Sequence, residues 1–425
     1  MAQPVQKASD TVARSTPELE VVRSLPTRIS GQAVGHDRGE PRFGVVEAAP
    51  AAAANRVIAV DALRGFTIFW ILGGDGLAWS LKQMAAGQGG FFAAIGNFIG
   101  LQLTHVAWEG FRFYDLIFPM LVFTVGVAIV LSLPRLVERE GKLKAHVRVL
   151  RRTALLFVLG LLYYGGLSHE WPDIRLLGVL QRLALCYLFA SLLFLNFNLR
   201  GLVVAFVTLL VGYWALLTFI PLPGMGTTSY AESFNLANWI DFHYLPGRMW
   251  NDTWDPEGLL STLPAIASCL IGVFAGMLLM NPRMDAQRKS LWLIGAGIVM
   301  VAAGYLWGLQ FPVIKNIWTS SFVLVTGGYG LLLLGVMHQL IDVWGMKTWA
   351  IIFVWIGANA ITLYFLNNVA SFDKFATRFV GGDVGSFLDR ALTPGAGRFA
   401  VHVVGLAIAV AVAGFLYRRK IFVRV

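Results

Sequence analysis

The sequence predicts an all-α integral membrane protein, a polytopic transmembrane helical bundle of about ten spans. Of its 425 residues, 57% are hydrophobic and only 14% are charged, whereas an ordinary soluble domain is about 25% charged. This charged fraction is too low to cover the surface of a soluble globular protein. It therefore argues against a soluble enzyme, a disordered chain or a nucleic-acid-binding domain. The 45 glycines are typical of helices that pack backbone to backbone in lipid.

Apolar stretches of about 18 residues or more predict the individual membrane helices. Six stretches contain no Lys, Arg, Asp or Glu: 116–134, 201–231, 258–282, 290–314, 316–341 and 348–372. Four weaker stretches bring the number to ten: 57–81, 153–168, 176–199 and 399–417. The stretch 201–231 is longer than one span needs, and Pro221 and Pro223 indicate where its helix ends.

The distribution of Lys and Arg predicts an orientation with both termini in the cytoplasm. With the N-terminus inside, 23 of the 34 basic residues fall in cytoplasmic segments and nine in external ones. The short connections agree, since 134–152 holds seven basic residues and 168–175 holds one. The net charge of +10 is therefore interpreted as a topology signal and a lipid-surface contact, not as a nucleic-acid-binding surface.

Residues 1–55 differ in composition from the rest of the chain. They are rich in Ala, Pro, Ser and charge and contain no apolar run long enough for a signal peptide. They predict a disordered cytoplasmic tail, followed by a transmembrane domain over 56–425. Cys186 and Cys269 both fall inside predicted spans and are interpreted as small buried apolar side chains.

Ionisable side chains inside a membrane span are costly, so each one is a candidate functional residue. The first span carries Asp61, Arg64 and Asp75, which share one narrow face at 100° per residue. Asp61 and Arg64 can pair within the helix near its cytoplasmic end, which is the structural interpretation. Asp75 lies ~20 Å further along, near the external end, with no evident partner in the span.

Other unusual polar residues are expected at the same external level of the membrane. They come from four further spans: His105, Trp108, Glu109, Asp115, Gln181, Arg182, Asp255, Glu257, Lys315, Asn316 and Trp318. This one-sided gathering indicates the wall of a site open to the outside, with His105 as its general-base candidate. A lone His near a membrane surface is more commonly structural. Asn359, in the middle of a span, either lines a ligand path or bonds across helices.

At these residues the chain resembles the heparan-alpha-glucosaminide N-acetyltransferases and their bacterial relatives, a family of polytopic membrane acyltransferases. The matching pieces follow the family's order along nearly the whole membrane part. They are Asp61-A-L-Arg64-Gly65, His105-V-A-Trp108-E-Gly110, Asp115-L-I-F-Pro119, Gly178-V-L-Gln181-Arg182, Asp255-Pro256-Glu257-Gly258, Lys315-Asn316-I-Trp318 and Asn359. Each piece is weak alone, and together they are a specific match.

The resemblance implies transfer of an acetyl group from cytoplasmic acetyl-CoA to an amino sugar or other glycan acceptor across the membrane. His105 falls on the family's proposed active-site histidine, and Asp75, a second catalytic candidate, departs from the Asn of the animal lysosomal enzyme. Acceptor binding or oxyanion stabilisation is expected of Trp108, Asp115, Gln181, Arg182, Asp255, Glu257 and Asn316. Asp61, Arg64 and Asn359 are expected to bind acetyl-CoA, and no metal is expected.

Several alternatives stay open at the level of sequence. The imidazole of His105 is oriented by Asp75 or by Asp115, and it acts as a general base or as a covalent acetyl carrier. The competing function is a secondary transporter of a small polar or sugar-like solute. A membrane partner protein without catalytic activity is the least specific alternative. The cytoplasmic tail favours a bacterial inner membrane with a periplasmic active-site mouth, and a homodimer is compatible with the sequence.

Overall fold

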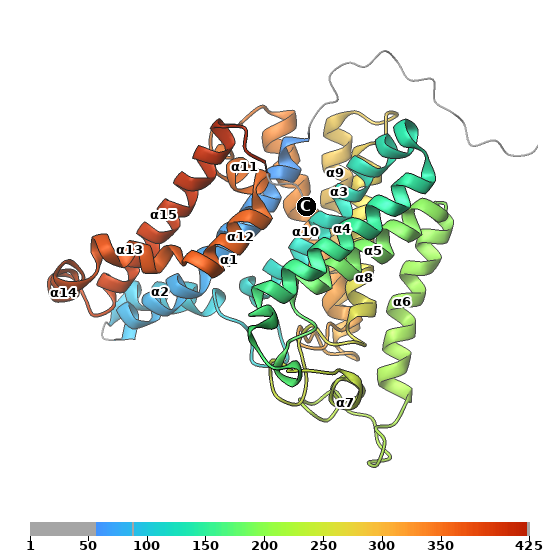
Figure 1. The fold of residues 1–425 in the computed structure, drawn as a ribbon, viewed down its shortest axis with the longest axis horizontal. Helices are drawn as coiled ribbons and strands as arrows, with labels where there is room; N and C mark the ends of the chain where they lie inside the picture. The colour runs from blue at the N-terminus through green and yellow to red at the C-terminus, as the bar shows by residue number, and fades with distance from the viewer. Residues whose placement is uncertain (1–56, 87–88, 423–425) are drawn as a thin grey trace, which may run out of the picture. The chain divides into compact units, whose positions relative to one another are not determined.

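The computed structural model describes residues 57–86 and 89–422, and the regular elements in these ranges are helices, as predicted (Figure 1). The chain divides into two units, Met1–Asn55 and Arg56–Val425. The predicted cytoplasmic tail over 1–55 lies outside the described residues. Within the described part, three isolated β-bridges join connecting segments: Glu109 with Ile314, Arg175 with Gly247 and Ala231 with Phe234.

Nine helices of the described part are 18 residues or longer. They are α1 (Ile58–Ala86), α3 (Ile117–Glu140), α4 (Lys142–Tyr163), α5 (Val179–Asn196), α6 (Leu199–Phe219), α8 (Thr262–Leu279), α9 (Ala286–Gly308), α10 (Ser320–Met337) and α15 (Ala396–Arg418). The shorter ones are α2 (Gly90–Gln102), η1 (Phe113–Leu116), η2 (Gly166–Ser168), η3 (Trp171–Asp173), α7 (Leu236–Tyr244), α11 (Ile351–Ala358), α12 (Ala360–Ala370), α13 (Phe372–Val380) and α14 (Gly382–Ala391). A π-helical turn, η4 (His338–Val343), continues α10.

Each of the ten predicted spans contains a helix, but fewer than ten helices meet the requirements for crossing a membrane. Seven of the described helices are long and apolar enough, or eight if α11 and α12, bent by 78° at their junction, form one broken span. The two that do not qualify are α1 and α4, because charged residues dilute their apolar character. The structure therefore supports seven or eight spans, and the predicted number of ten stays a prediction.

One boundary differs from the sequence-based expectation and another agrees with it. The basic segment 134–152 is not a loop, because α3 and α4 run through it and only Gly141, at φ +87°, separates them. The helix predicted within 201–231 ends at Phe219, just before Pro221, as the prolines indicated. The remainder belongs to a long connection over 220–261 that contains α7.

Glycines allow the closest helix contacts of this unit. A Cβ atom at Gly126 of α3 would lie 1.9 Å from the carbonyl oxygen of Cys269 in α8. One at Gly65 of α1 would lie 1.7 Å from the carbonyl oxygen of Phe353 in α11. Only glycine permits backbones to approach so closely, as the composition indicated. Cys186 and Cys269 are both buried free thiols, which confirms their interpretation as small buried side chains.

The described helices share two ends, which we name after one residue each. At the Asp342 end, the amides of Ile58 and Ala59 at the start of α1 donate to the Asp342 carboxylate, both at 3.1 Å. The His105 end collects four connections: 103–112, 164–178, 220–261 and 309–319 (Figure 1). Hydrogen bonds join them, from Gly110 N to Val313 O at 2.9 Å and from Arg248 N to Ile174 O at 3.1 Å.

Candidate active site

His105 lies in the connection between α2 and η1, where a buried carboxylate holds its ring. Its Nδ1 is 2.8 Å from Oδ1 of Asp115, whose side chain is 1% exposed. The second oxygen of Asp115 accepts the backbone amides of Val106 at 3.3 Å and Arg112 at 3.1 Å. Asp115 thereby fixes both the imidazole and the loop that carries it. The His105 side chain itself is 47% exposed, so a ligand can reach it.

Lys315, from the connection between α9 and α10, lies against the same imidazole. Its Nζ is 2.8 Å from Nδ1 and 3.0 Å from Nε2 of His105, and 3.6 Å from Oδ1 of Asp115. Burial lowers the pKa of Lys315, and the negative charge of Asp115 opposes that shift. The three side chains therefore form a compact group, which we call the His105 cluster, with an amine beside the candidate base.

Asp75 approaches this cluster from α1 through a tyrosine. The ring of Tyr114 lies 4.7 Å from the imidazole of His105, centroid to centroid, and the carboxylate of the exposed Asp75 lies beside the Tyr114 hydroxyl. Gly74 makes room for the Tyr114 ring, because a Cβ there would lie 2.4 Å from it. The sequence left open whether Asp75 or Asp115 bonds the imidazole, and in the structure Asp115 does so.

Arg175, which the sequence analysis did not single out, organises the two acidic residues of the D-P-E-G segment. Its guanidinium donates to Asp255 at 2.9 and 2.7 Å and to Glu257 at 2.8 Å. It also lies over the rings of Tyr164 and Trp250, at 4.5 and 4.9 Å. Its carboxylate partners raise the pKa of Arg175 against the effect of burial. The sequence shows Arg175 as an isolated basic residue in an external connection, which could have marked it as a site candidate. The sequence analysis used it only to predict the orientation in the membrane.

The two carboxylates have different surroundings. Asp255 is buried and also accepts the backbone amides of Trp250 at 3.0 Å and Glu257 at 2.9 Å, so its oxygens are occupied. Burial and the neighbouring Asp255 raise the pKa of Glu257, which also interacts electrostatically with Arg182 and Lys315. Glu257 is bonded to Arg175, as Asp255 is, but Asp255 is the carboxylate that holds Arg175 through both of its oxygens.

Arg182, in the first turn of α5, is fully buried. One nitrogen, Nη2, donates to Ser261 Oγ at 2.5 Å and to the Gly258 carbonyl at 3.2 Å, and the guanidinium lies 5.0 Å from the Trp318 ring. Nε and Nη1 find no hydrogen-bond partner among the described residues. The neighbouring Gln181 is also fully buried, and in the part of the chain described both of its amide atoms are likewise unpartnered.

Trp318 has an unusual backbone conformation beside this arginine. Its φ is +53°, a value that a bulky side chain adopts only when the surroundings enforce it. The surroundings do so here, because Tyr213 donates to the carbonyl of Ile317 at 2.5 Å and the Trp318 indole donates to Ser268 Oγ at 3.0 Å. Strain of this kind clusters at functional sites, which fits the position of Trp318 between α5, α8 and α10.

Trp108, Asn316 and Asp241 complete the His105 end. Trp108 donates to the Tyr230 carbonyl at 2.8 Å, and Asn316 donates to the Ala107 carbonyl at 3.2 Å. Asp241 of α7 is 2% exposed and accepts the Leu259 amide at 2.8 Å. Burial raises the pKa of Asp241 to about 7. The sequence analysis missed Asp241, because nothing near it in sequence distinguishes it from a surface residue of the connection.

The residues expected to bind acetyl-CoA lie apart from the His105 cluster. Asp61 and Arg64 pair at 3.6 Å, as the sequence indicated. Asn359 separates α11 from α12 and is 1% exposed. Both sites flank the crossing of α1 and α11, where Gly65 meets Gly357. On the continuous helix α1, Asp61 and Asp75 are ~20 Å apart at 1.5 Å per residue.

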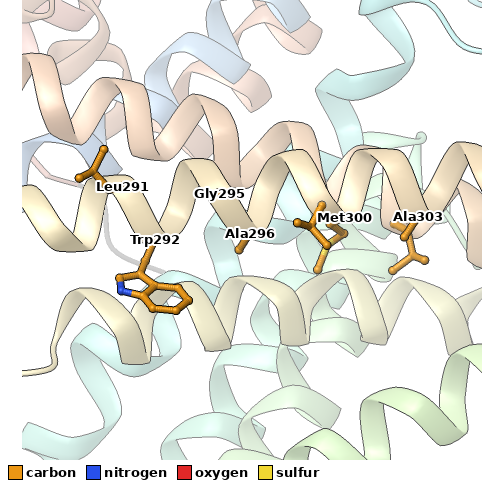
Figure 2. A pocket seen from close by; sticks show the side chains of 8 residues that line it. Leu291, Trp292, Gly295, Ala296, Met300 and Ala303 are labelled. Atoms are coloured by element: carbon orange, nitrogen blue, oxygen red, sulfur yellow. The ribbon is translucent and has the colours of Figure 1, made fainter.

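The larger of the two best-defined pockets is not at this site. It is an open groove along α9 of about 660 Å³, lined by Leu291, Trp292, Gly295, Ala296, Val299, Met300, Ala303 and Leu324, and Figure 2 shows Trp292 and Met300 on the helix. Its lining has no ionisable group, so it fits a lipid-facing surface. Among the described residues, no three His, Cys, Asp or Glu side chains are grouped so as to hold a metal ion.

Comparisons with known proteins find two curated relatives, and no family model matches the chain. The heparan-alpha-glucosaminide N-acetyltransferase of Homo sapiens is 27% identical over an alignment of 376 positions that spans 75% of this chain and 55% of the human protein. The enzyme of the same name from Mus musculus is 24% identical over an alignment of 430 positions that spans 87% of this chain and 60% of the mouse protein. The chain thus matches somewhat more than half the length of these relatives.

Proposed function

We propose that this chain, which its two curated matches place among the relatives of the heparan-alpha-glucosaminide N-acetyltransferases, is an integral-membrane acetyltransferase. It transfers an acetyl group from acetyl-CoA to an amino sugar or another glycan acceptor. The observation that carries this proposal is the His105 cluster. An exposed imidazole with an oriented carboxylate and an adjacent amine lies at one end of a membrane helix bundle. His105 stands in the motif that the chain shares with that family.

The geometry of His105 fits a general base. With its proton on Nδ1 and donated to Asp115, the imidazole presents the lone pair of Nε2 to the acceptor. As the acceptor nitrogen attacks the thioester carbonyl, its proton passes to Nε2. The buried carboxylate of Asp115 then stabilises the imidazolium that forms. The C–S bond breaks, and the thiolate of CoA leaves and takes up a proton.

Negative charge develops on the carbonyl oxygen during this attack and needs donors close to the base. Lys315 is suited to this role, because its Nζ lies 3.0 Å from Nε2 of His105. Asn316, the next residue, adds an amide at the same place. Glu257, held by Arg175, faces this region and is suited to bind an acceptor ammonium or hydroxyl group. Trp108 provides an apolar surface for a sugar ring.

A covalent route uses the same residues. Nε2 of His105 attacks the thioester, an N–C bond forms as the C–S bond breaks, and the acetyl-imidazole then passes the acetyl group to the acceptor. Incubation of purified protein with radiolabelled acetyl-CoA and no acceptor separates the two routes. Label that attaches to wild-type protein but not to His105→Ala supports the carrier, and label that never attaches supports direct transfer.

The membrane arrangement is part of the proposal. The Asp342 end faces the cytoplasm, where basic residues cluster at the ends of α3, α4 and α15. Acetyl-CoA enters from that side, with Arg64 near its phosphates, and the His105 end faces the periplasm of a bacterial inner membrane. Acetyl-CoA serves as co-substrate, and the residues of the site need no metal for this chemistry.

The experiment that tests the proposed function is a transfer assay on purified protein with acetyl-CoA, glucosamine and related acceptors, read by mass spectrometry. We expect an acetylated product from wild-type protein. His105→Ala should lose about a hundredfold to ten-thousandfold in kcat, the range of general-base catalysis. His243→Ala is the matched control, because His243 is exposed on α7 and its one hydrogen bond among the described residues goes to the Trp239 carbonyl of its own helix. Equal rates for both variants would refute the catalytic role of His105.

One observation favours the competing function. Broken helices inside a membrane often build the binding sites of secondary transporters, and α11 and α12 form such a pair. A transporter would carry glucosamine into sealed proteoliposomes without acetyl-CoA, whereas an acetyltransferase would not. Uptake measured with and without acetyl-CoA inside the vesicles therefore separates the two functions.

A further inference from the structure

Asn359 has an unusual environment for a buried amide. It stands at the junction of α11 and α12, where the helix axis bends by 78°. Its side chain is 1% exposed, yet neither Nδ2 nor Oδ1 has a hydrogen-bond partner within residues 57–86 and 89–422. A primary amide without partners in an apolar span is costly, because neither lipid nor close-packed side chains replace the lost water.

Thr362, one turn further along α12, has the same property. Its hydroxyl is buried and has no partner among the described residues. Thr67 and Thr326, inside continuous helices, bond to the carbonyl four residues earlier, Thr67 to Leu63 at 2.9 Å and Thr326 to Phe322 at 2.8 Å. Thr153 in α4, in contrast, also lacks a partner among the described residues. For Thr362 the residue four positions earlier is Ala358, the last residue of α11, on the other side of the bend. The bend therefore releases this hydroxyl from its usual bond.

Gln181 shows that an unpartnered amide alone does not make a site. Its amide is packed against α4, because a Cβ at Gly160 would lie 2.3 Å from Gln181 Oε1. The backbone of α4 thus occupies the space that a ligand would need. Asn359 differs because it stands at a break between two helices, where one helix can shift without breaking the hydrogen bonds of the other.

The position of the break links it to the His105 end. α11 is clamped to α1 at the crossing of Gly357 with Gly65. α12 leads away from it to Tyr364, whose ring stacks on that of Tyr163 at 4.6 Å. The adjacent Tyr164 lies under the guanidinium of Arg175. The free polar groups at 359 and 362 therefore lie on the helix that runs between the Asp61–Arg64 pair and the catalytic end.

We propose that Asn359 and Thr362 form a subsite for the two secondary amides in the arm of the thioester donor. The inference rests on the proposed function and deepens it. Asn359 donates from Nδ2 to the carbonyl of one amide and accepts the N–H of the other at Oδ1, because a trans amide points its own C=O and N–H in opposite directions. Thr362 supplies a further hydroxyl. The arm that joins the thioester of acetyl-CoA to its nucleotide contains two such amides, and no other part of an acetyl donor matches this pair so well.

Binding requires a local movement, because the amide atoms are shielded in the present conformation. The clamp at Gly357 holds α11 on α1, so α12 is the element that shifts. The arm of the donor then occupies the opened break and lies along α12, with its thioester directed to the His105 cluster.

The test compares two donors that differ only at these amides: S-acetylpantetheine and an analogue in which both amides are esters, which keeps the carbonyls and loses the N–H groups. Full-length wild-type protein should prefer the amide donor by tenfold or more in kcat/KM, the order of one lost hydrogen bond to a buried group. In Asn359→Leu the preference should fall to about twofold or less. Thr362→Val should weaken binding of both donors through the lost hydroxyl.

Two further readouts separate ligand binding from a structural role. Without donor, Asn359→Leu should melt at or above the wild-type temperature, because an apolar side chain of similar size replaces an unpartnered amide. With donor, S-acetylpantetheine should raise the melting temperature of wild type more than the ester analogue does, and it should raise that of Asn359→Leu no more than the analogue. Thr326→Val is the matched control, since its hydroxyl is already bonded within its own helix, and it should keep the wild-type preference.

Each outcome decides the inference. It is wrong if Asn359→Leu keeps the tenfold preference, or if it loses activity on both donors by the same factor. If wild-type protein transfers no acetyl group at all, the proposed function fails, and the melting temperatures still decide the subsite. In that case, an equal rise in the melting temperature of wild type with S-acetylpantetheine and with the ester analogue would overturn the proposed subsite.

Discussion

At the scale of single residues, the chemistry of the candidate site depends on where the proton of His105 lies. A histidine next to a carboxylate keeps its proton on the bonded nitrogen, so in the proposed reaction the lone pair of Nε2, which has Lys315 Nζ 3.0 Å away, accepts the proton. Lys315 adds a positive charge at the place where an oxyanion would form. The function of His105 thus depends on two residues that are 10 and 210 positions away in sequence.

Asp115→Asn tests this arrangement without removing the hydrogen bonds that hold the loop. The Asn oxygen can still accept the amides of Val106 and Arg112, whereas its NH₂ group would face Nδ1 and force the proton onto Nε2. We expect kcat to fall by about a thousandfold or more with little change in KM. Steady-state kinetics with the identified acceptor measures both. Asp252→Asn, an exposed residue of the 220–261 connection, is the control, and similar losses in the two variants would contradict the argument.

Asp241 predicts a pH dependence of stability. Its pKa is about 7 in the folded protein because of burial, against 3.8 for an unperturbed Asp. Between these values the unfolded chain has lost the proton that the folded chain retains, so stability falls as pH rises from about 4 to 7. The free energy of unfolding should fall in total by an amount on the order of 4 kcal/mol over this pH range.

The measurement is the melting temperature in detergent between pH 5 and pH 8. We expect wild type to lose more stability over this range than Asp241→Asn, which cannot titrate. Parallel pH profiles for the two proteins would show that Asp241 is not the group responsible.

At the scale of elements, glycines decide which helices touch. α1 and α11 cross at Gly65 and Gly357, and a Cβ at Gly357 would lie 2.0 Å from the carbonyl oxygen of Asp61. Because that neighbour is backbone, it cannot move aside as a flexible side chain could. The crossing fixes α11, the first half of the broken helix pair, onto the helix that carries Asp61, Arg64 and Asp75.

Gly357→Ala should therefore lower the melting temperature of the detergent-solubilised protein by several degrees. The added methyl group overpacks the crossing and should reduce the free energy of unfolding by about 1–3 kcal/mol. Gly212→Ala in α6 is the matched control, because a Cβ there meets nothing within 4 Å. It should leave stability unchanged or raise it slightly, since Ala favours the helix over Gly. An unchanged melting temperature for Gly357→Ala would contradict the tight crossing.

The elements also show what the sequence patterns could indicate. Each of the ten predicted apolar stretches contains a helix, because burial in lipid requires apolar residues whatever the tertiary fold. They did not indicate that 134–152 is helical, since basic residues at helix ends resemble a loop in a hydropathy pattern. Nor did they indicate the 78° bend at Asn359, which interrupts an otherwise continuous apolar stretch.

At the scale of the whole molecule, the orientation in the membrane is the property that links structure with the proposed reaction. The His105 end and the Asp342 end must face opposite sides if acetyl-CoA and acceptor meet across the bilayer. The excess of basic residues at the Asp342 end predicts that this end is cytoplasmic.

Cysteine labelling tests that orientation. In a chain with Cys186→Ala and Cys269→Ala, Asp252→Cys lies at the His105 end and Arg283→Cys at the Asp342 end, and both positions are exposed. A membrane-impermeant maleimide should label Asp252→Cys in intact cells and label Arg283→Cys only after permeabilisation. The opposite pattern would invert the proposed topology.

The sequence by itself determined that this is a helical membrane protein, where its long apolar stretches form helices and which motif residues to examine. These properties follow from composition and local periodicity, because lipid imposes the same demands on every segment. Only the tertiary structure decided that Asp115 rather than Asp75 bonds His105, that Lys315 joins them, and that Arg175 holds Asp255 and Glu257. Those contacts join connections far apart in the chain. Their partners are chosen by packing and charge in three dimensions, and no spacing along the sequence records that choice.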